Sequence, residues 1–149
     1  RRFLMDFYNS TPEERARFYA QAAERVNQTD GYAKGSHVRI THIALGSAEG
    51  ELEVCPEVLN PLGIVHGGCL TTLADTVAGV AAHSSGLRCV TLNNTMNYFK
   101  PGREGKIYCK AQVEKAGRTV QVCQATLTND QGEMVASGTF TFYALGPAE

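Results

Sequence analysis

Apolar residues near the beginning of the chain recur at a spacing typical of an amphipathic helix. They lie four positions apart and are Phe18, Ala22 and Val26. Thr11, Pro12 and Glu14 supply an N-cap, a proline in the first turn and a capping-box glutamate, three signals that begin a helix. With a shorter amphipathic turn predicted at residues 3–8, this helix forms a predicted N-terminal helical arm over residues 1–35.

From His37 onward apolar positions alternate with polar ones, which is typical of β-strands. Two strands, at about residues 38–45 and 49–55, are separated by a glycine-containing turn and form a predicted hairpin. Four more strands are predicted, with turn residues between them. They lie at about residues 88–99, 106–115, 119–129 and 133–145.

Between the hairpin and the later strands lies a segment, Gly67 to His83, in which almost every position is apolar or small. Such a segment is expected to form a buried helix. An antiparallel sheet can bury one long apolar helix by curling around it. The pattern therefore predicts an α+β domain over residues 36–149, with an antiparallel sheet wrapped around one long central helix.

The composition excludes several classes of function. The chain has 149 residues and a formal net charge of −1, so it provides no field that would attract nucleic acid or an anionic membrane. Asp6 interrupts the apolar residues at the start, so we expect no secretion signal and a cytoplasmic location. The five cysteines contain no CxxC pair, and we expect buried free thiols, with neither disulfides nor a metal site.

The most informative residues lie at the start of the apolar helix. Gly67 and Gly68 open it, although a glycine inside a helix is about 1 kcal/mol less favourable than alanine. The free N–H groups of a helix N-terminus can donate to a developing oxyanion, so one interpretation is that a substrate approaches this backbone. The alternative is that the glycines permit tight packing between the loop and the helix.

Asp75 interrupts an apolar run in the same helix. A carboxylate in such surroundings is expected to be partly buried, and it is then either a catalytic base or a structural residue that needs hydrogen-bond partners. His66 lies directly before the helix. It either orients the loop through backbone hydrogen bonds or polarises a substrate carbonyl.

These residues belong to an ordered set of motifs. The motifs are Asn60, His66-Gly67-Gly68, Leu73-Ala74-Asp75-Thr76 and a strand end at Asn97-Tyr98-Phe99-Lys100-Pro101. Over about residues 37–145 the chain resembles the hotdog-fold acyl-CoA thioesterases of the phenylacetate-degradation (PaaI-like) type. The resemblance implies hydrolysis of acyl-CoA, with no metal or organic cofactor, by a homodimer that is often paired into a homotetramer.

The resemblance also implies roles for single residues. The N–H of Gly67 would polarise the thioester carbonyl, and Asn60 and His66 would shape the pocket around it. Asp75 would act as general base or nucleophile, and Thr91 falls where the family often places a hydroxyl that assists the attacking water. The helical arm exceeds the minimal domain, so a packing arm, a lid and an assembly element all remain open as its role.

Basic residues gather between residues 100 and 118, where six Lys and Arg stand against two Glu in a chain that is close to neutral. Such a segment suits a polyphosphate ligand, for which the phosphates of CoA are candidates. The alternative is a solvated strand face with ordinary charges. Lys100, Arg103 and Arg118 lie in predicted turns, and with Gly68 they are the predicted substrate-binding residues.

Two other functions remain open at this point. A hydratase or dehydratase of the same fold would pair a His with a helix Asp or Glu for proton transfer, and His66 and Asp75 superficially fit. A non-catalytic acyl-CoA-binding sensor would bind ligand in the same pocket and transmit occupancy through the arm, although the presence of Asp75 argues against a pure binder. The acyl group is also open, from aromatic to long-chain.

Helix geometry constrains how the site is assembled. Asp75 lies nine residues after His66, which in a regular helix is about 13.5 Å of rise and about 900° of rotation, close to opposite faces. The two residues therefore cannot flank one thioester carbonyl within a single chain. Either one of them takes no part in the chemistry, or each site combines the Gly67 end of one subunit's helix with Asp75 of its partner, as an isologous dimer allows.

Overall fold

The computed structural model describes residue 7 and residues 9–148. Its main element is a six-stranded antiparallel sheet with strand order β1-β2-β4-β5-β6-β3. The strands are β1 (Val38–Ala44), β2 (Ser47–Glu53), β3 (Leu87–Tyr98), β4 (Lys106–Ala116), β5 (Val120–Thr128) and β6 (Met134–Pro147). Of the turn predicted at residues 3–8, residue 7 alone falls within the described part, where it is helical and buried.

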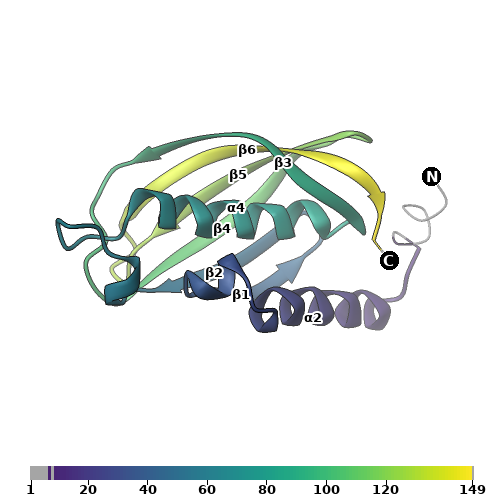
Figure 1. Ribbon diagram of the computed structural model, residues 1–149. Coiled ribbons are helices and arrows are strands. Elements are labelled where there is room, and N and C mark those ends of the chain that lie inside the picture. Colours follow the sequence, from purple (N-terminus) through teal and green to yellow (C-terminus); the bar gives the residue numbers. More distant parts are fainter. Residues whose placement is uncertain (1–6, 8, 149) are drawn as a thin grey trace.

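The long helix α4 (Gly67–His83) lies in the hollow of the curved sheet and contacts all six strands (Figure 1). The side chains that the helix buries are all apolar, and they are Leu70, Leu73, Ala74, Val77, Ala78, Val80, Ala81 and Ala82. A Cβ at Gly50 of β2 would stand 2.6 Å from Cγ2 of Val77, so the bare backbone there lets the helix touch the sheet. This arrangement confirms the predicted α+β architecture with one central helix.

Alternating burial in the strands explains why the sheet covers the helix. Along β5 every second residue is buried, and along β6 Phe140 and Phe142 point into the same core. Strand β3 differs, because nine of its twelve residues are exposed and β6 is the one strand among the described residues that pairs with it. The sheet therefore ends at β3 in a long edge whose outer side is unpaired.

The N-terminal arm contains α2 (Pro12–Gln28) and the short helix α3 (Tyr32–Gly35). The predicted capping box is present, because Thr11 Oγ1 accepts from the N–H of Glu14 and the Glu14 carboxylate accepts from the N–H of Thr11. Asn27 links α2 to β1 through two hydrogen bonds to Ile40. Its side-chain NH₂ donates to the Ile40 carbonyl at 2.9 Å, and its side-chain oxygen accepts from the Ile40 N–H at 2.8 Å. The arm thus packs along β1 and continues toward the end of α4 (Figure 1).

The arm also contacts the last turn of α4 through aromatic rings. The ring centroids of Phe7 and Phe18 lie 5.1 Å apart, and those of Phe18 and His83 also lie 5.1 Å apart. The hydroxyl of Tyr19 donates to the carbonyl of Ser84 at 3.2 Å. These contacts make α2 one wall of the space beside α4.

All five cysteines are free thiols. Cys109 and Cys123 are buried as expected, whereas Cys55, Cys69 and Cys89 are half-buried because they lie at the margins of the core.

Within the part of the chain that the structure describes, none of the helices has both the length and the apolar character that a membrane-spanning helix needs.

Candidate active site

Asp75 and Thr91 form a hydrogen-bonded pair. Asp75 lies in the middle of α4 and is half-buried, and Thr91 faces it from β3. Oγ1 of Thr91 donates to Oδ1 of Asp75 at 2.7 Å. Within the described residues no other group bonds to this carboxylate, so Oδ2 is free to accept a proton or to reach a reacting carbon.

The Asp75–Thr91 pair lies at a cleft of about 520 Å³ between α2, α4 and β3, which we call the Asp75 cleft. Its lining residues are Ala22, Arg25, Val26, Asp75, Thr76, Gly79, Val80, His83, Arg88, Cys89, Val90, Thr91 and Phe142. Most of the wall is apolar, and Asp75 is the one acidic residue among the described residues that line it. Burial raises the pKa of the Cys89 thiol to about 11, which leaves this cysteine protonated and a poor nucleophile at neutral pH.

Asn60 organises the loop that leads into α4. Its Oδ1 accepts from the N–H groups of Leu62 at 3.0 Å and Ile64 at 3.3 Å, and its backbone N–H donates to the carbonyl of Ile64. An asparagine side chain of this kind holds its own turn by bonding to nearby backbone. The side-chain NH₂ has no acceptor within the described residues, so it can donate to a ligand.

His66 caps the N-terminus of α4. Its Nδ1 accepts from the N–H of Gly68 at 2.8 Å, so a neutral ring carries its proton on Nε2. This bond occupies the N–H of Gly68, and a Cβ at Gly68 would stand 3.0 Å from Nδ1 of His66. Tight packing therefore accounts for Gly68, whose N–H is not free for a substrate.

Gly67 is different from Gly68. Its N–H has no acceptor within the described residues, and a Cβ at this position would meet the Tyr98 ring at 3.6 Å, an ordinary contact. Packing within the chain thus does not require a glycine here. A free N–H at the positive end of a helix is the donor that an oxyanion needs.

Tyr98 is a site residue whose anchoring contacts the sequence did not reveal. Its hydroxyl contacts Oγ1 of Thr71 at 2.5 Å and donates to the carbonyl of Gly67 at 3.2 Å, so it holds the end of β3 against the start of α4. It lines a second cleft of about 390 Å³, which we call the Gly67 cleft. The residues of the Gly67 cleft are Asn60, Ile64, Val65, Gly67, Leu70, Tyr98, Phe99, Lys100, Pro101, Gly102 and Arg103.

The predicted basic residues separate into two places. Lys100 and Arg103 line the Gly67 cleft, and Lys100 also pairs with Glu133 at 3.1 Å, an ion pair that is half exposed. Arg118 lies in the turn after β4, at the opposite end of an 11-residue strand from Arg103, which corresponds to roughly 35 Å. Within one chain, Arg118 is therefore remote from the cleft that Lys100 and Arg103 line.

The candidate catalytic residues also fall into two groups. The Asp75 cleft and the Gly67 cleft share no lining residue, because the first lies beside the middle and end of α4 and the second lies beside its start. Asp75 and Thr91 lie in the first cleft, and Asn60 and Gly67 lie in the second. Within one chain, these candidate catalytic residues therefore lie in two separate clefts.

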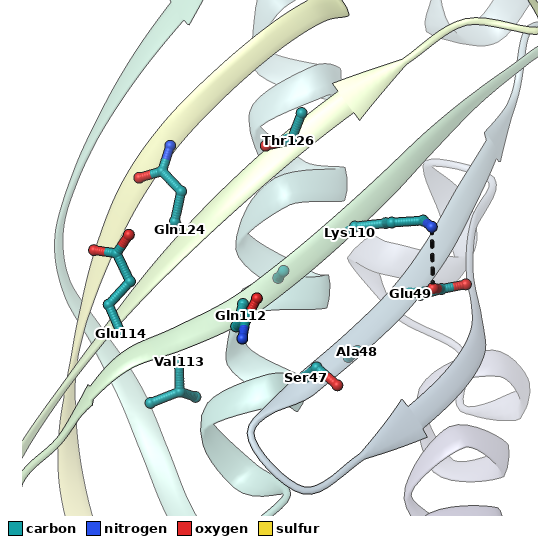
Figure 2. A pocket seen from close by; sticks show the side chains of 10 residues that line it. Ser47, Ala48, Glu49, Lys110, Gln112, Val113, Glu114, Gln124 and Thr126 are labelled. Atoms are coloured by element: carbon teal, nitrogen blue, oxygen red, sulfur yellow. Dashed lines mark ion pairs between the residues drawn. The ribbon is translucent and has the colours of Figure 1, made fainter. Parts of the chain in front are cut away.

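A larger hollow, of about 580 Å³, lies elsewhere on the molecule. Figure 2 shows its polar side chains on the near face of β2, β4 and β5, with α4 behind the sheet. Its lining is both polar and apolar, and Lys110 and Glu49, on neighbouring strands, form an ion pair there at 3.5 Å. It contains none of the predicted site residues, so its size does not make it the better candidate, and Lys110 belongs to a solvated strand face.

One group of possible metal ligands occurs within the described residues, namely His37, Cys55 and Glu57, whose ligand atoms lie within 4.8 Å of one another. Burial, and then the neighbouring Glu57, raise the pKa of the Cys55 thiol. Metal binding by cysteine requires the thiolate. The group shares no residue with the Asp75 cleft or the Gly67 cleft.

Comparison with known proteins places the chain in a family. The family model of the thioesterase superfamily matches residues 62–136. The chain is 32% identical over 117 residues to the acyl-coenzyme A thioesterase PaaI of Escherichia coli K12, a match that covers 78% of this chain and 84% of PaaI. The structure of E. coli PaaI is similar with a TM-score of 0.81 and 29% identity, over 87% of this chain and 95% of that one.

Two streptococcal structures are similar as well. A protein from Streptococcus mutans UA159 bound to acetyl-CoA has a TM-score of 0.72 and 32% identity, over 75% of this chain and 91% of that one. A hypothetical thioesterase from Streptococcus pneumoniae TIGR4 with coenzyme A has a TM-score of 0.72 and 33% identity, with the same coverage. The pneumococcal protein has also been solved as an aspartate-to-alanine and a threonine-to-alanine variant, at positions sixteen residues apart.

The family match over half of the chain and the identity to PaaI show that the chain belongs to the thioesterase superfamily. It has the hotdog fold that the sequence predicted, and it is a thioester hydrolase of the PaaI-like type.

Proposed function

We propose that the chain hydrolyses acyl-CoA thioesters, with the catalytic carboxylate supplied by Asp75. The observation that carries this proposal is the Thr91–Asp75 hydrogen bond at a cleft whose wall is mostly apolar, which leaves one carboxylate oxygen free. Two similar structures hold acetyl-CoA and CoA. The pneumococcal variants replace an aspartate and a threonine at the same sixteen-residue separation as Asp75 and Thr91.

In the proposed reaction, water attacks the thioester carbonyl carbon and Asp75 accepts its proton. The bond to sulfur breaks as the tetrahedral intermediate collapses, and CoA leaves as a thiolate that takes up a proton. Thr91 fixes one carboxylate oxygen, and its own oxygen can accept a hydrogen bond from the attacking water. Alternatively, Asp75 attacks the carbonyl directly and forms an anhydride, which water then hydrolyses.

The oxyanion of the tetrahedral intermediate would bind at the Gly67 cleft. The N–H of Gly67 and the side-chain NH₂ of Asn60 are the unoccupied donors there within the described residues. His66 caps α4 beside Gly67, and Asn60 holds its own loop by accepting from the N–H of Leu62. One donor of this kind contributes about 10²- to 10³-fold to kcat. Lys100 and Arg103, at the mouth of the same cleft, would bind the phosphates of CoA.

The Asp75 cleft and the Gly67 cleft would each be one half of an active site. The two halves would come together at the interface of a homodimer. Strand β3 offers an unpaired edge twelve residues long, and it exposes Val90 and Leu92 at 45% and 57%. A long unpaired edge that carries exposed apolar side chains is typical of a surface that another strand or chain covers. A two-fold axis beside β3 would bring Asp75 of one chain to Gly67 of its partner and create two equivalent sites. Pairing of two dimers into a tetramer remains part of this proposal.

The alternative functions receive less support from the geometry. A hydratase or dehydratase would need His66 beside a carboxylate, but Nδ1 of His66 caps α4, and His66 lines neither the Asp75 cleft nor the Gly67 cleft. A pure sensor would have no use for a carboxylate held by Thr91 at the cleft.

Replacement of Asp75 tests the proposal. Asp75→Asn keeps the shape of the side chain but removes the base and the nucleophile, so kcat for acyl-CoA hydrolysis, measured by thiol release over a panel of acyl groups, should fall by at least about 10²-fold. Asp30→Asn is the matched control, because Asp30 is exposed, pairs with Lys34 and lines neither the Asp75 cleft nor the Gly67 cleft. A kcat near that of the wild type in Asp75→Asn would rule out the assignment.

A further inference from the structure

The Asp75 cleft extends well beyond the catalytic carboxylate. Asp75, Gly79 and His83 follow one another at four-residue spacing on one side of α4 and all line it. Eight residues of helix separate the first from the last, which corresponds to about 12 Å. The cleft is therefore long enough for an extended acyl group that points from the thioester toward the end of α4.

In the middle of the cleft α4 contributes backbone without a side chain, because residue 79 is a glycine. A Cβ at this position would lie 3.5 Å from the Phe142 ring, in ordinary contact, and the residue has no unusual backbone angle. Packing in the chain thus does not explain a glycine in the interior of a helix, where alanine is more favourable. An acyl group that passes over the backbone at this point does explain it.

The walls around Gly79 are apolar, and the far end is not. Ala22 and Val26 of α2 and Val80 and Phe142 of the core form the walls. The far end presents the guanidinium groups of Arg25 on α2 and Arg88 on β3, both exposed and neither in an ion pair within the described residues. Asp75 is the one acidic group of the described lining, and it lies at the opposite end.

The third polar group at the far end is His83. Its Nδ1 bonds to the carbonyl of Leu87, so Nδ1 carries a proton and Nε2 is the acceptor in a neutral ring. Phe18 covers the ring from the arm. Arg25 and Arg88 therefore supply the fixed positive charge at the far end of the cleft, and the His83 ring forms part of the cleft wall.

We infer that the cleft selects an acyl group with a carboxylate at its far end, so that the substrates are CoA thioesters of dicarboxylic acids. This inference rests on the proposed function. Arg25 and Arg88 are its specificity-determining residues, because guanidinium groups bind carboxylates through strong charge-assisted hydrogen bonds. A short diacid would place its carboxylate beside Asp75 and be repelled, whereas one of medium length reaches the arginines.

The first test compares substrates of matched length. The ratio of kcat/KM for adipyl-CoA to that for hexanoyl-CoA, and for suberyl-CoA to octanoyl-CoA, should favour the diacid in the wild type. Each of Arg25→Gln and Arg88→Gln should lower the ratio by about tenfold or more, the size expected for a hydrogen bond to a charged group. Arg17→Gln is the matched control, since Arg17 is an exposed arginine of α2 outside the cleft, and it should leave the ratio unchanged.

The second test fills the cleft at Gly79. Gly79→Ala should fold with unchanged or higher thermal stability, because the added methyl group fits against Phe142. Gly79→Leu should reach into the cleft and lower the ratio of kcat/KM for suberyl-CoA to that for acetyl-CoA by at least about tenfold, as expected when an acyl group loses its apolar contacts. Circular dichroism checks that both variants are folded.

The outcomes separate this inference from the proposed function. If monoacyl-CoAs are hydrolysed but diacids are not preferred, or if the preference survives in the Arg25→Gln/Arg88→Gln double variant, the inference is wrong and the proposed function stands. If no acyl-CoA is hydrolysed, the proposed function fails, and calorimetric binding of uncleavable thioether analogues decides the inference. Tighter binding of the suberyl than of the octanoyl analogue, lost in the double variant, supports it, and equal binding overturns it.

Discussion

Gly67 and Gly68 stand side by side at the start of α4, yet their surroundings differ. The N–H of Gly68 bonds to the His66 ring, and a side chain there would press on that ring. The N–H of Gly67 is free, and a side chain there would make an ordinary contact with Tyr98. In the proposed site, Gly67 thus acts through its backbone N–H and Gly68 through the space it leaves for His66.

This difference allows the oxyanion donor to be removed cleanly. Gly67 is the first residue of α4, a position at which proline is well tolerated, and the ψ angle of His66 is 133°, which suits a residue before proline. Gly67→Pro should fold and lower kcat by about 10²- to 10³-fold through loss of the N–H. Steady-state kinetics of both variants, with Gly67→Ala as the control that retains the donor, check this prediction. Similar kcat values for the two would show that the N–H has no catalytic role.

Thr91 shows what the sequence could not decide about single residues. The alternation of β3 did not reveal which face meets the helix, because apolar residues occur on both faces of this strand. The structure resolves the question through one contact, the hydrogen bond to Asp75. In a single chain this edge strand exposes side chains on both faces, so the burial that normally marks one face of a strand is missing. The sequence alone therefore did not show which face of β3 meets the helix.

At the scale of elements, the sequence predicted most of the fold. Every strand of the sheet and both long helices were expected, and their observed ends differ from the predicted ones by at most about two residues, because long periodic segments with clear turn residues carry strong signals. The short helices α3 and η1 (Pro56–Val58) were not expected. Elements of three or four residues contain too few positions to show a period.

The contact between α2 and the end of α4 makes stability depend on pH. Burial lowers the pKa of His83, and the charge of Arg25 lowers it further, although the bond to the Leu87 carbonyl acts in the opposite direction. The unfolded chain therefore binds this proton at a higher pH than the folded chain does. The free energy of unfolding should fall as the pH drops from above 6.5, the ordinary value for histidine, through the lower pKa of the folded state.

Denaturant unfolding between about pH 8 and pH 5 measures this dependence. His83→Gln does not titrate, and its amide can still donate to the Leu87 carbonyl. Its unfolding free energy should change less with pH than that of the wild type. Equal pH dependence of the two proteins would contradict the role given to His83.

At the scale of the whole molecule, the candidate site was predicted in part. The sequence motif supplied Asn60, His66, Gly67 and Asp75, and helix geometry predicted that His66 and Asp75 cannot flank one thioester carbonyl within a single chain. In the structure Asp75 lines one cleft, Asn60 and Gly67 line another, and His66 lines neither. The far end of the Asp75 cleft was not predicted, because its residues come from α2, α4 and β3, which are distant in the sequence and form no motif.

In the proposed enzyme two chains share each active site, and complementation between two inactive chains tests this arrangement most directly. Asp75→Asn and Gly67→Pro chains with different affinity tags are co-expressed, and heterodimers are purified through both tags. A shared site predicts one intact and one doubly damaged site per heterodimer. Acyl-CoA hydrolysis should then return to about half of the wild-type kcat per dimer. Folded heterodimers as inactive as either parent homodimer would contradict the account and place Asp75 and Gly67 in separate functions.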